Sequence, residues 1–144
     1  MSVFVLVFVG IFGHYVRVIQ GQGERAAVLS TLGALRTALV IDHVQHAATG
    51  GSNSTRAALN PFLVVQTPPL NYRGEMTVTQ LLAAPAGSWV FDPQCGCIGY
   101  LPLDPAWHSA ADGTAVLWFK VVAGTGVLEL AAQAPYVWQG VPVR

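Results

Sequence analysis

The sequence is poor in charged residues. Only 10% of its 144 residues are Asp, Glu, Lys or Arg, whereas about a quarter is usual for a soluble domain. Seven basic and seven acidic side chains balance, so no basic surface for nucleic acid or for an anionic membrane surface is indicated. Hydrophobic residues make up 53% of the chain, and its mean hydropathy is +0.50. This composition favours a membrane-anchored or self-assembling protein over a free cytosolic enzyme.

Cysteine is scarce as well. Cys95 and Cys97 are the only two cysteines, which is too few for a disulfide scaffold and says little about the compartment. One glycine separates them in a predicted turn, where they could form a short-loop disulfide or ligate a soft metal. We expect two small turn thiols that can be oxidised to a disulfide, rather than a metal site.

The motifs of nucleotide-binding and hydrolytic enzymes are absent. The sequence contains no P-loop, no dinucleotide-binding glycine pattern and no nucleophile elbow around a serine. We therefore expect no catalytic residue, no cofactor and no enzymatic activity.

Some histidines and aspartates are metal ligands by residue type. His43 and His46 lie three residues apart beside Asp42 in a predicted helix, a spacing that can place two imidazoles on one face. No third ligand is indicated nearby, so we expect a solvated helix face. Three aspartates fall in loops after predicted strands: Asp92, Asp104 and Asp112. We expect them to form turns, with a calcium site as the alternative, and predict no metal site.

A long apolar run opens the chain. Val3–Gly13 is almost purely hydrophobic, but a bilayer-spanning helix needs about 20 residues. Extension to Ile19 gives a plausible span that includes Arg17, which is tolerable near the interface. We expect this segment to insert into a membrane or a helix bundle. A cleaved signal peptide and an ordinary buried helix are the alternatives, although no basic residues precede the run and no small-residue cleavage site follows it.

An amphipathic helix is predicted over residues 24–49. Apolar residues recur there at spacings of four and three: Val28, Leu32, Leu35 and Leu39. We expect Arg25, Arg36 and Asp42 to turn outward, Glu24 to favour a helix N-terminus, and Gly50-Gly51 to end the helix. Glycines upstream mark places where the helix is expected to kink, melt or pack closely: Gly10, Gly13, Gly21 and Gly23.

The second half of the chain changes from helical to strand-like patterns. Residues 50–87 form a proline-rich loop region, with a possible helical turn near residues 77–85 and a glycosylation sequon at Asn53. Residues 88–139 hold two predicted hairpins, SWVFD-PQCGC-IGYLP and AVLWFKVV-AGTG-VLELAA, followed by a short edge strand. His108 is expected in an exposed loop. The pattern predicts an α+β fold, in which a long N-terminal helix packs on an antiparallel sheet of about four strands.

The order of these motifs resembles the type IV pilin and type II secretion pseudopilin superfamily. The resemblance rests on the apolar-to-amphipathic helix with QGQGERAAVLSTLGALRTAL, followed by NPFLVV, PPLNYRGE, PAGSWVFDPQCGCIGYL and VLWFKVV-AGTG-VLELA. It covers nearly the whole chain, and the succession of loop and hairpin motifs is more specific than the helix.

The resemblance implies a filament subunit. Residues 1–23 would be the helix half that lies in the inner membrane and then in a filament core, and residues 24–144 the periplasmic, pilin-like domain on its outside. The implied core residues are Val3, Phe4, Leu6, Phe8, Val9, Ile11 and Phe12. The implied partners are copies of this chain or other pilin-like subunits, with no nucleic acid. A membrane-tethered periplasmic binding or enzyme domain is the alternative function.

Two features of the family have no counterpart here. The resemblance implies a short basic leader ending in glycine and a glutamate a few residues into the mature helix, yet SVFVLV contains no acid. We expect either that the first residues of the family pattern lie upstream, or that the chain is a minor subunit of the kind that lacks the glutamate.

Overall fold

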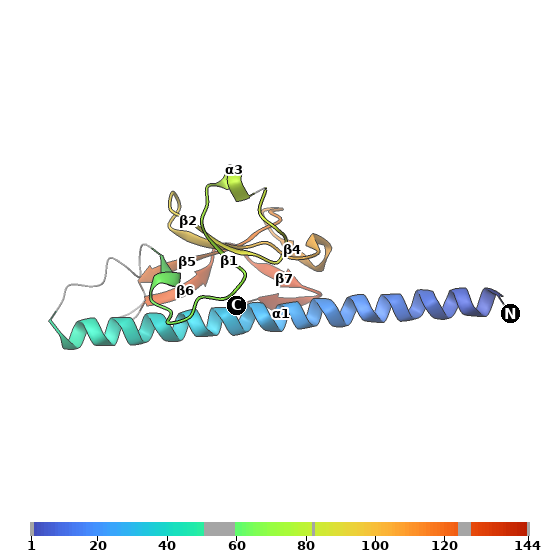
Figure 1. The fold of residues 1–144 in the computed structure, drawn as a ribbon, viewed down its shortest axis with the longest axis horizontal. Coiled ribbons are helices and arrows are strands. Elements are labelled where there is room, and N and C mark those ends of the chain that lie inside the picture. The colour runs from blue at the N-terminus through green and yellow to red at the C-terminus, as the bar shows by residue number, and fades with distance from the viewer. Residues whose placement is uncertain (1, 51–59, 82, 124–127, 144) are drawn as a thin grey trace.

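One helix runs along nearly the whole length of the molecule. The structure, a computed structural model, describes residues 2–50, 60–81, 83–123 and 128–143. Helix α1 (Ser2–Ala48) carries two small sheets on one side, and its N-terminal part projects beyond them (Figure 1). The other elements are η1 (Pro61–Leu63), β1 (Tyr72–Glu75), α3 (Val78–Leu81), β2 (Trp89–Asp92), β3 (Cys97–Tyr100), η2 (Pro105–Trp107), β4 (His108–Ala110), β5 (Leu117–Ala123), β6 (Leu128–Ala132), β7 (Tyr136–Trp138) and β8 (Val141–Val143). The predicted α+β class, with a long N-terminal helix on a mostly antiparallel sheet, is confirmed.

Helix α1 is continuous through its glycines. Of the alternatives predicted for the glycines, melting of the helix is wrong, because helical geometry runs from Ser2 to Ala48 without interruption. Close packing is confirmed at Gly21, which lies against Gln139 and Trp107. Each glycine costs about 1 kcal/mol against alanine, a cost that the cooperativity of a long helix and contacts with the domain can absorb. The helix ends close to the predicted place, where Gly50 has φ +68° and its N–H donates to the Ala47 carbonyl.

The larger sheet has five strands in the order β1-β2-β3-β5-β6. Both predicted hairpins are confirmed: β2 pairs antiparallel with β3, and β5 with β6. The turn predicted at AGTG, residues 123–126, lies almost wholly outside the described residues. Strand β1 was missed, since its sequence lies in the predicted proline-rich connection. It pairs parallel to β2 at the edge of the sheet, where an irregular strand containing Gly74 at φ +89° is accommodated.

The C-terminal residues form a second sheet rather than an extension of the first. Strands β4, β7 and β8 pair antiparallel in the order β4-β7-β8. The expectation that His108 lies in a loop is therefore wrong, because it begins β4, directly after η2. Pro142 lies in β8 at an edge of this sheet, as predicted for a strand that cannot donate at that position.

The core lies between the leucine ridge of α1 and one face of the larger sheet. Val28, Leu32, Leu35 and Leu39 are each at most 1% exposed, which confirms the predicted buried face. Successive residues of a strand point to opposite faces, so alternate positions supply the opposing layer. These residues are Trp89, Phe91, Ile98, Tyr100, Leu117, Phe119 and Leu130, joined by Tyr136 and Trp138 of the smaller sheet.

The segment before β1 packs on the end of this core. Asn60 caps η1, since its Oδ1 accepts from the Phe62 N–H at 3.0 Å, and Pro61 occupies the first turn. Phe62 is buried and stacks on Tyr72 with ring centroids 4.0 Å apart. The predicted single helical turn after β1 is confirmed as α3.

Candidate functional site

The N-terminal part of α1 exposes apolar side chains around its whole circumference. Among its large hydrophobic residues, exposed fractions range from 53% at Ile11 to 84% at Phe4. The exposed set is Val3, Phe4, Val5, Leu6, Val7, Phe8, Val9, Ile11, Phe12, Tyr15 and Ile19. It contains all seven residues that the family resemblance places in a filament core. We call residues 3–19 the apolar segment.

Water is an unfavourable environment for this surface. Burying one large apolar side chain contributes roughly 1.5–3 kcal/mol, and the apolar segment presents many of them on every side. A helix that is apolar all round is covered by lipid or by other helices. In the helix, an 18-residue window reaches a mean hydropathy of 1.8 with none of it buried inside the chain. By length and composition, helix α1 is therefore long and apolar enough to cross a membrane.

The sheet domain contacts α1 at the end of the apolar segment. Gln139 Nε2 donates to the Val18 carbonyl at 3.3 Å, and Trp138 Nε1 donates to the Gly21 carbonyl at 2.9 Å. Gly21 is needed for this close approach, because a Cβ there would lie 2.8 Å from Gln139 Cδ and 3.1 Å from Trp107 Cδ2. The domain thus contacts the helix from Val18 onward, which is within the last two residues of the apolar segment.

Glu24 is the central polar residue of this junction. Its side chain is buried, and its Oε1 accepts from the Tyr100 hydroxyl at 2.6 Å and from the Leu103 N–H at 2.8 Å. Burial, together with the hydrogen bond to Glu24, raises the pKa of Tyr100 well above its ordinary value of 10.0. Within the described part of the chain, Glu24 Oε2 and the buried Nε of Arg25 have no hydrogen-bond partner.

Sequence reasoning missed the role of Glu24. The carboxyl was expected to favour a helix N-terminus, but no helix begins there, and it binds a strand and a loop instead. The detectable signal was its position four residues before Val28, which puts it in register with the leucine ridge. Arg36 was likewise expected to point outward, yet it is half-buried and its Nη2 donates to the Leu130 carbonyl at 3.3 Å.

The histidines and aspartates that were considered as metal ligands do not come together at one site. Among the described residues, no three His, Cys, Asp or Glu side chains are grouped as a metal would require. His46 Nδ1 lies 2.8 Å from the Asp42 carbonyl oxygen and 3.4 Å from Asp42 Oδ1. The three loop aspartates each accept hydrogen bonds within their own turn, from Gln94, Ala106 and Thr114.

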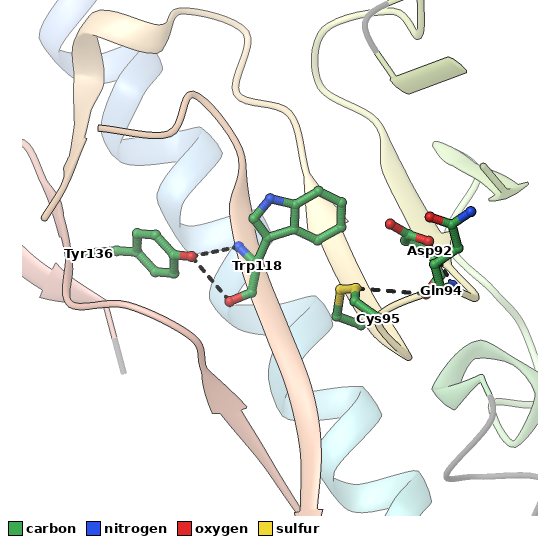
Figure 2. Close-up of a disulfide and its surroundings, with 6 residues drawn as sticks. Asp92, Gln94, Cys95, Trp118 and Tyr136 are labelled. Carbon is green, nitrogen blue, oxygen red and sulfur yellow. Dashed lines mark hydrogen bonds between the residues drawn. A yellow bond between two sulfur atoms is a disulfide. The ribbon is translucent and has the colours of Figure 1, made fainter. Parts of the chain in front are cut away.

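Cys95 and Cys97 form a disulfide in the turn between β2 and β3 (Figure 2). Their Cα atoms are 5.3 Å apart, and Gly96 between them adopts φ +62°. Asp92 starts this turn by accepting from the Gln94 N–H at 2.8 Å. The disulfide therefore ties together a hairpin turn and lies apart from the apolar segment.

His108 is not exposed as expected. It begins β4 with 9% exposure, and its ring lies against Trp138 at a centroid distance of 6.1 Å. Pairing of β4 with β7 turns this side chain inward, which a loop assignment could not reveal. The sequon at Asn53 lies outside the described residues.

Comparison with protein-family models, with curated proteins and with solved structures gives no match to this chain. What the structure supports is the coarser description: a long apolar N-terminal helix joined to a sheet domain, an architecture compatible with a pilin-like subunit.

Proposed function

We propose that this chain is a structural subunit of a pilin-like filament, of the type IV pilus or type II secretion pseudopilus kind, and that it assembles through the apolar segment. The observation that carries the proposal is the all-round exposure of residues 3–15 on a helix whose second half buries one face, the leucine ridge, against its own domain. Such a segment needs apolar neighbours on every side, and identical helices supply them.

The domain is placed as a filament subunit requires. Both sheets lie on one side of α1, and Gln139, between β7 and β8, contacts the helix at Val18, near the end of the apolar segment (Figure 1). The residues before Val18 are left free to pack against other copies. Because α1 is one continuous helix, the domain is held at a fixed distance from the packed segment. In a filament this arrangement would place the helices in the core and the sheets outside.

Before assembly the apolar segment would be held in the inner membrane, with the domain on the periplasmic side. The same apolar surface suits lipid and helix packing, since lipid tails and Leu or Phe side chains are alike in polarity. Transfer from lipid to a filament core therefore exchanges one apolar environment for another. On this proposal the chain acts by assembly rather than by catalysis.

The proposal is tested by imaging and by exchange of the segment. Cells producing the chain with its assembly machinery are examined by electron microscopy for thin filaments. The matched variant replaces residues 3–19 with an unrelated membrane-spanning helix of equal length. We expect filaments from the native chain and none from the variant, which should stay in the membrane fraction. Filaments that persist after the exchange, or a native chain that remains a dispersed membrane protein, would contradict the proposal.

A further inference from the structure

Two loops of the domain lie at the same level of α1 as the end of the apolar segment. The first comprises Leu103–Trp107, and the second comprises Gln139–Pro142; we call them the basal loops. They are joined by a hydrogen bond from the Gln139 N–H to the Trp107 carbonyl at 2.7 Å. Gln139 reaches Val18, and the Leu103 N–H reaches Glu24, so the two loops contact α1 between the end of the apolar segment and Glu24.

The basal loops are apolar and exposed. Leu103 is 60% exposed and Val141 is 45% exposed, although neither is needed by the core. Pro105, Ala106 and Pro142 are also exposed beside them. Residues 101–111 and 133–143 contain no Lys, Arg or Glu and a single Asp. That residue, Asp104, accepts a hydrogen bond from the Ala106 N–H and so caps η2.

The level at which α1 would leave a bilayer is marked by its own sequence. Arg17 is the first charged residue after the apolar run, and its long side chain can place the guanidinium among lipid headgroups. Val18, whose carbonyl accepts a hydrogen bond from Gln139, directly follows Arg17. Gly21, whose carbonyl accepts a hydrogen bond from Trp138, lies two residues beyond Ile19. At a helix rise of 1.5 Å per residue, this is about 3 Å along the axis. The headgroup layer on each side of a bilayer is about 5–7 Å thick, so the Val18 and Gly21 contacts fall within it. Glu24, which binds the Leu103 N–H, lies about 7.5 Å beyond Ile19, at the outer edge of this layer.

We infer that the basal loops are a lipid-contacting surface, which seats the domain on the headgroup layer while the apolar segment spans the bilayer. The inference rests on the membrane-inserted stage of the proposed function. The occupant is lipid because the loops continue directly from the membrane-spanning surface without a spacer, and because they are nearly free of charge. Leu103 and Val141 would enter the interface, and Trp107, half-buried against Gly21, suits the same layer.

Seating on lipid has a mechanical consequence. The domain lies on one side of α1, so contact through the basal loops favours a tilt of the helix toward that side. Extraction of the subunit must then detach the basal loops as well as remove the apolar segment from lipid.

The test measures how deeply single positions lie in vesicles. Full-length chains carrying Cys95→Ser and Cys97→Ser receive one new cysteine at a time, Leu103→Cys or Val141→Cys, labelled with a nitrobenzoxadiazole fluorophore. They are reconstituted at high lipid-to-protein ratio in phosphatidylethanolamine and phosphatidylglycerol vesicles. Two matched positions are labelled in the same way: Leu70→Cys, on a fully exposed loop residue, and Phe8→Cys, in the apolar segment.

We expect the labels at positions 103 and 141 to lose quenching by aqueous iodide and to gain quenching by headgroup-nitroxide lipids, while position 70 remains open to iodide. If position 8 is shielded but positions 103 and 141 quench as fully as position 70, the lipid-contact proposal is overturned and the filament proposal stands. Iodide quenching at position 8 would overturn both. Shielding at position 103 that disappears on dilution with lipid would assign the surface to a second copy and overturn the choice of lipid.

Discussion

At the scale of single residues, the junction between the apolar segment and the domain depends on Glu24. A buried carboxyl group is costly unless it is hydrogen-bonded, and Tyr100 and Leu103 supply the donors for one of its oxygens. The contact links residues that are 76 positions apart in the chain. It therefore fixes how far along α1 the sheet domain lies, as well as adding stability.

Removal of the Tyr100 hydroxyl should weaken the fold. In Tyr100→Phe the Glu24 carboxyl loses one of the two hydrogen-bond donors that the described residues supply. We expect a loss of about 1.5–3 kcal/mol in the free energy of unfolding. Urea unfolding in detergent, followed by tryptophan fluorescence, measures it. Tyr15→Phe is the matched control, because Tyr15 is 63% exposed on the apolar segment. Equal stabilities of the two variants would contradict the role given to Glu24.

Alkaline pH should destabilise the domain. Burial is the largest cause that raises the pKa of Tyr72, Tyr100 and Tyr136 above 10.0. The folded state thus holds these protons more tightly than the unfolded chain. The stability they contribute is fully present below about pH 9 and falls as the pH rises through 10 and beyond. Urea midpoints measured between pH 8 and 11 should show this decline, with a shallower slope in Tyr100→Phe. A flat profile would contradict it.

Two glycines two residues apart should respond differently to alanine. Nothing lies within 4 Å of a Cβ placed on Gly23, so Gly23→Ala should stabilise α1 by roughly 0.5–1 kcal/mol through helix propensity. At Gly21 the new methyl would displace the Gln139 side chain and press on Trp107, so Gly21→Ala should lack this gain. Thermal unfolding of the two variants side by side gives the comparison. A stabilised Gly21→Ala would show that the close approach is unimportant.

At the scale of elements, the ridge of α1 carries more stability than the disulfide. Leu32, Leu35 and Leu39 are 0–1% exposed against the sheet. Truncation of such a side chain costs about 2–5 kcal/mol, so Leu35→Ala should be strongly destabilising. Val44→Ala is the control on the same helix, because Val44 is 58% exposed. A Leu35→Ala variant as stable as Val44→Ala would exclude the packing described here.

The disulfide closes a loop with one intervening residue, Gly96. The entropy removed from the unfolded chain is small for so short a loop, so the double variant Cys95→Ser/Cys97→Ser should lose only roughly 1–2 kcal/mol. The β2–β3 hairpin is also held by backbone pairing at positions 89–92 and 97–100, which does not depend on the disulfide. Urea unfolding of the oxidised and doubly substituted chains tests this, and a loss as large as that of Leu35→Ala would contradict it.

Periodicity predicted the elements that are locally encoded. The leucine ridge and the two hairpins follow from spacings of three and four or of two residues, together with turn residues between the strands. Strands β1 and β4 were missed because each is short and interrupted by glycine or flanked by a 3₁₀ turn, and each gains its pairing from a distant strand. The apolar segment was identified from composition. The junction at Glu24, Tyr100 and Trp138 was not, because it joins parts of the chain that sequence spacing does not relate.

At the scale of the whole molecule, α1 joins two environments. Its first half offers an apolar surface to lipid or to other helices, and its second half is the backbone of a folded domain. The domain is hydrogen-bonded to the helix where its two halves meet. Gln139 donates to the Val18 carbonyl and Trp138 donates to the Gly21 carbonyl. A force or displacement applied to the apolar segment is therefore transmitted directly to the sheets.

Photo-crosslinking inside cells measures what covers the apolar segment. In one variant a benzophenone amino acid replaces Phe8, which is 76% exposed. A separate control variant carries the same amino acid in place of Val122, an exposed position of β5. After irradiation, we predict a ladder of dimers and larger products from position 8, with cross-links to residues 3–19 of another copy. The absence of such products, with lipid as the only adduct at position 8, would show that the segment is an anchor and that the filament proposal is wrong.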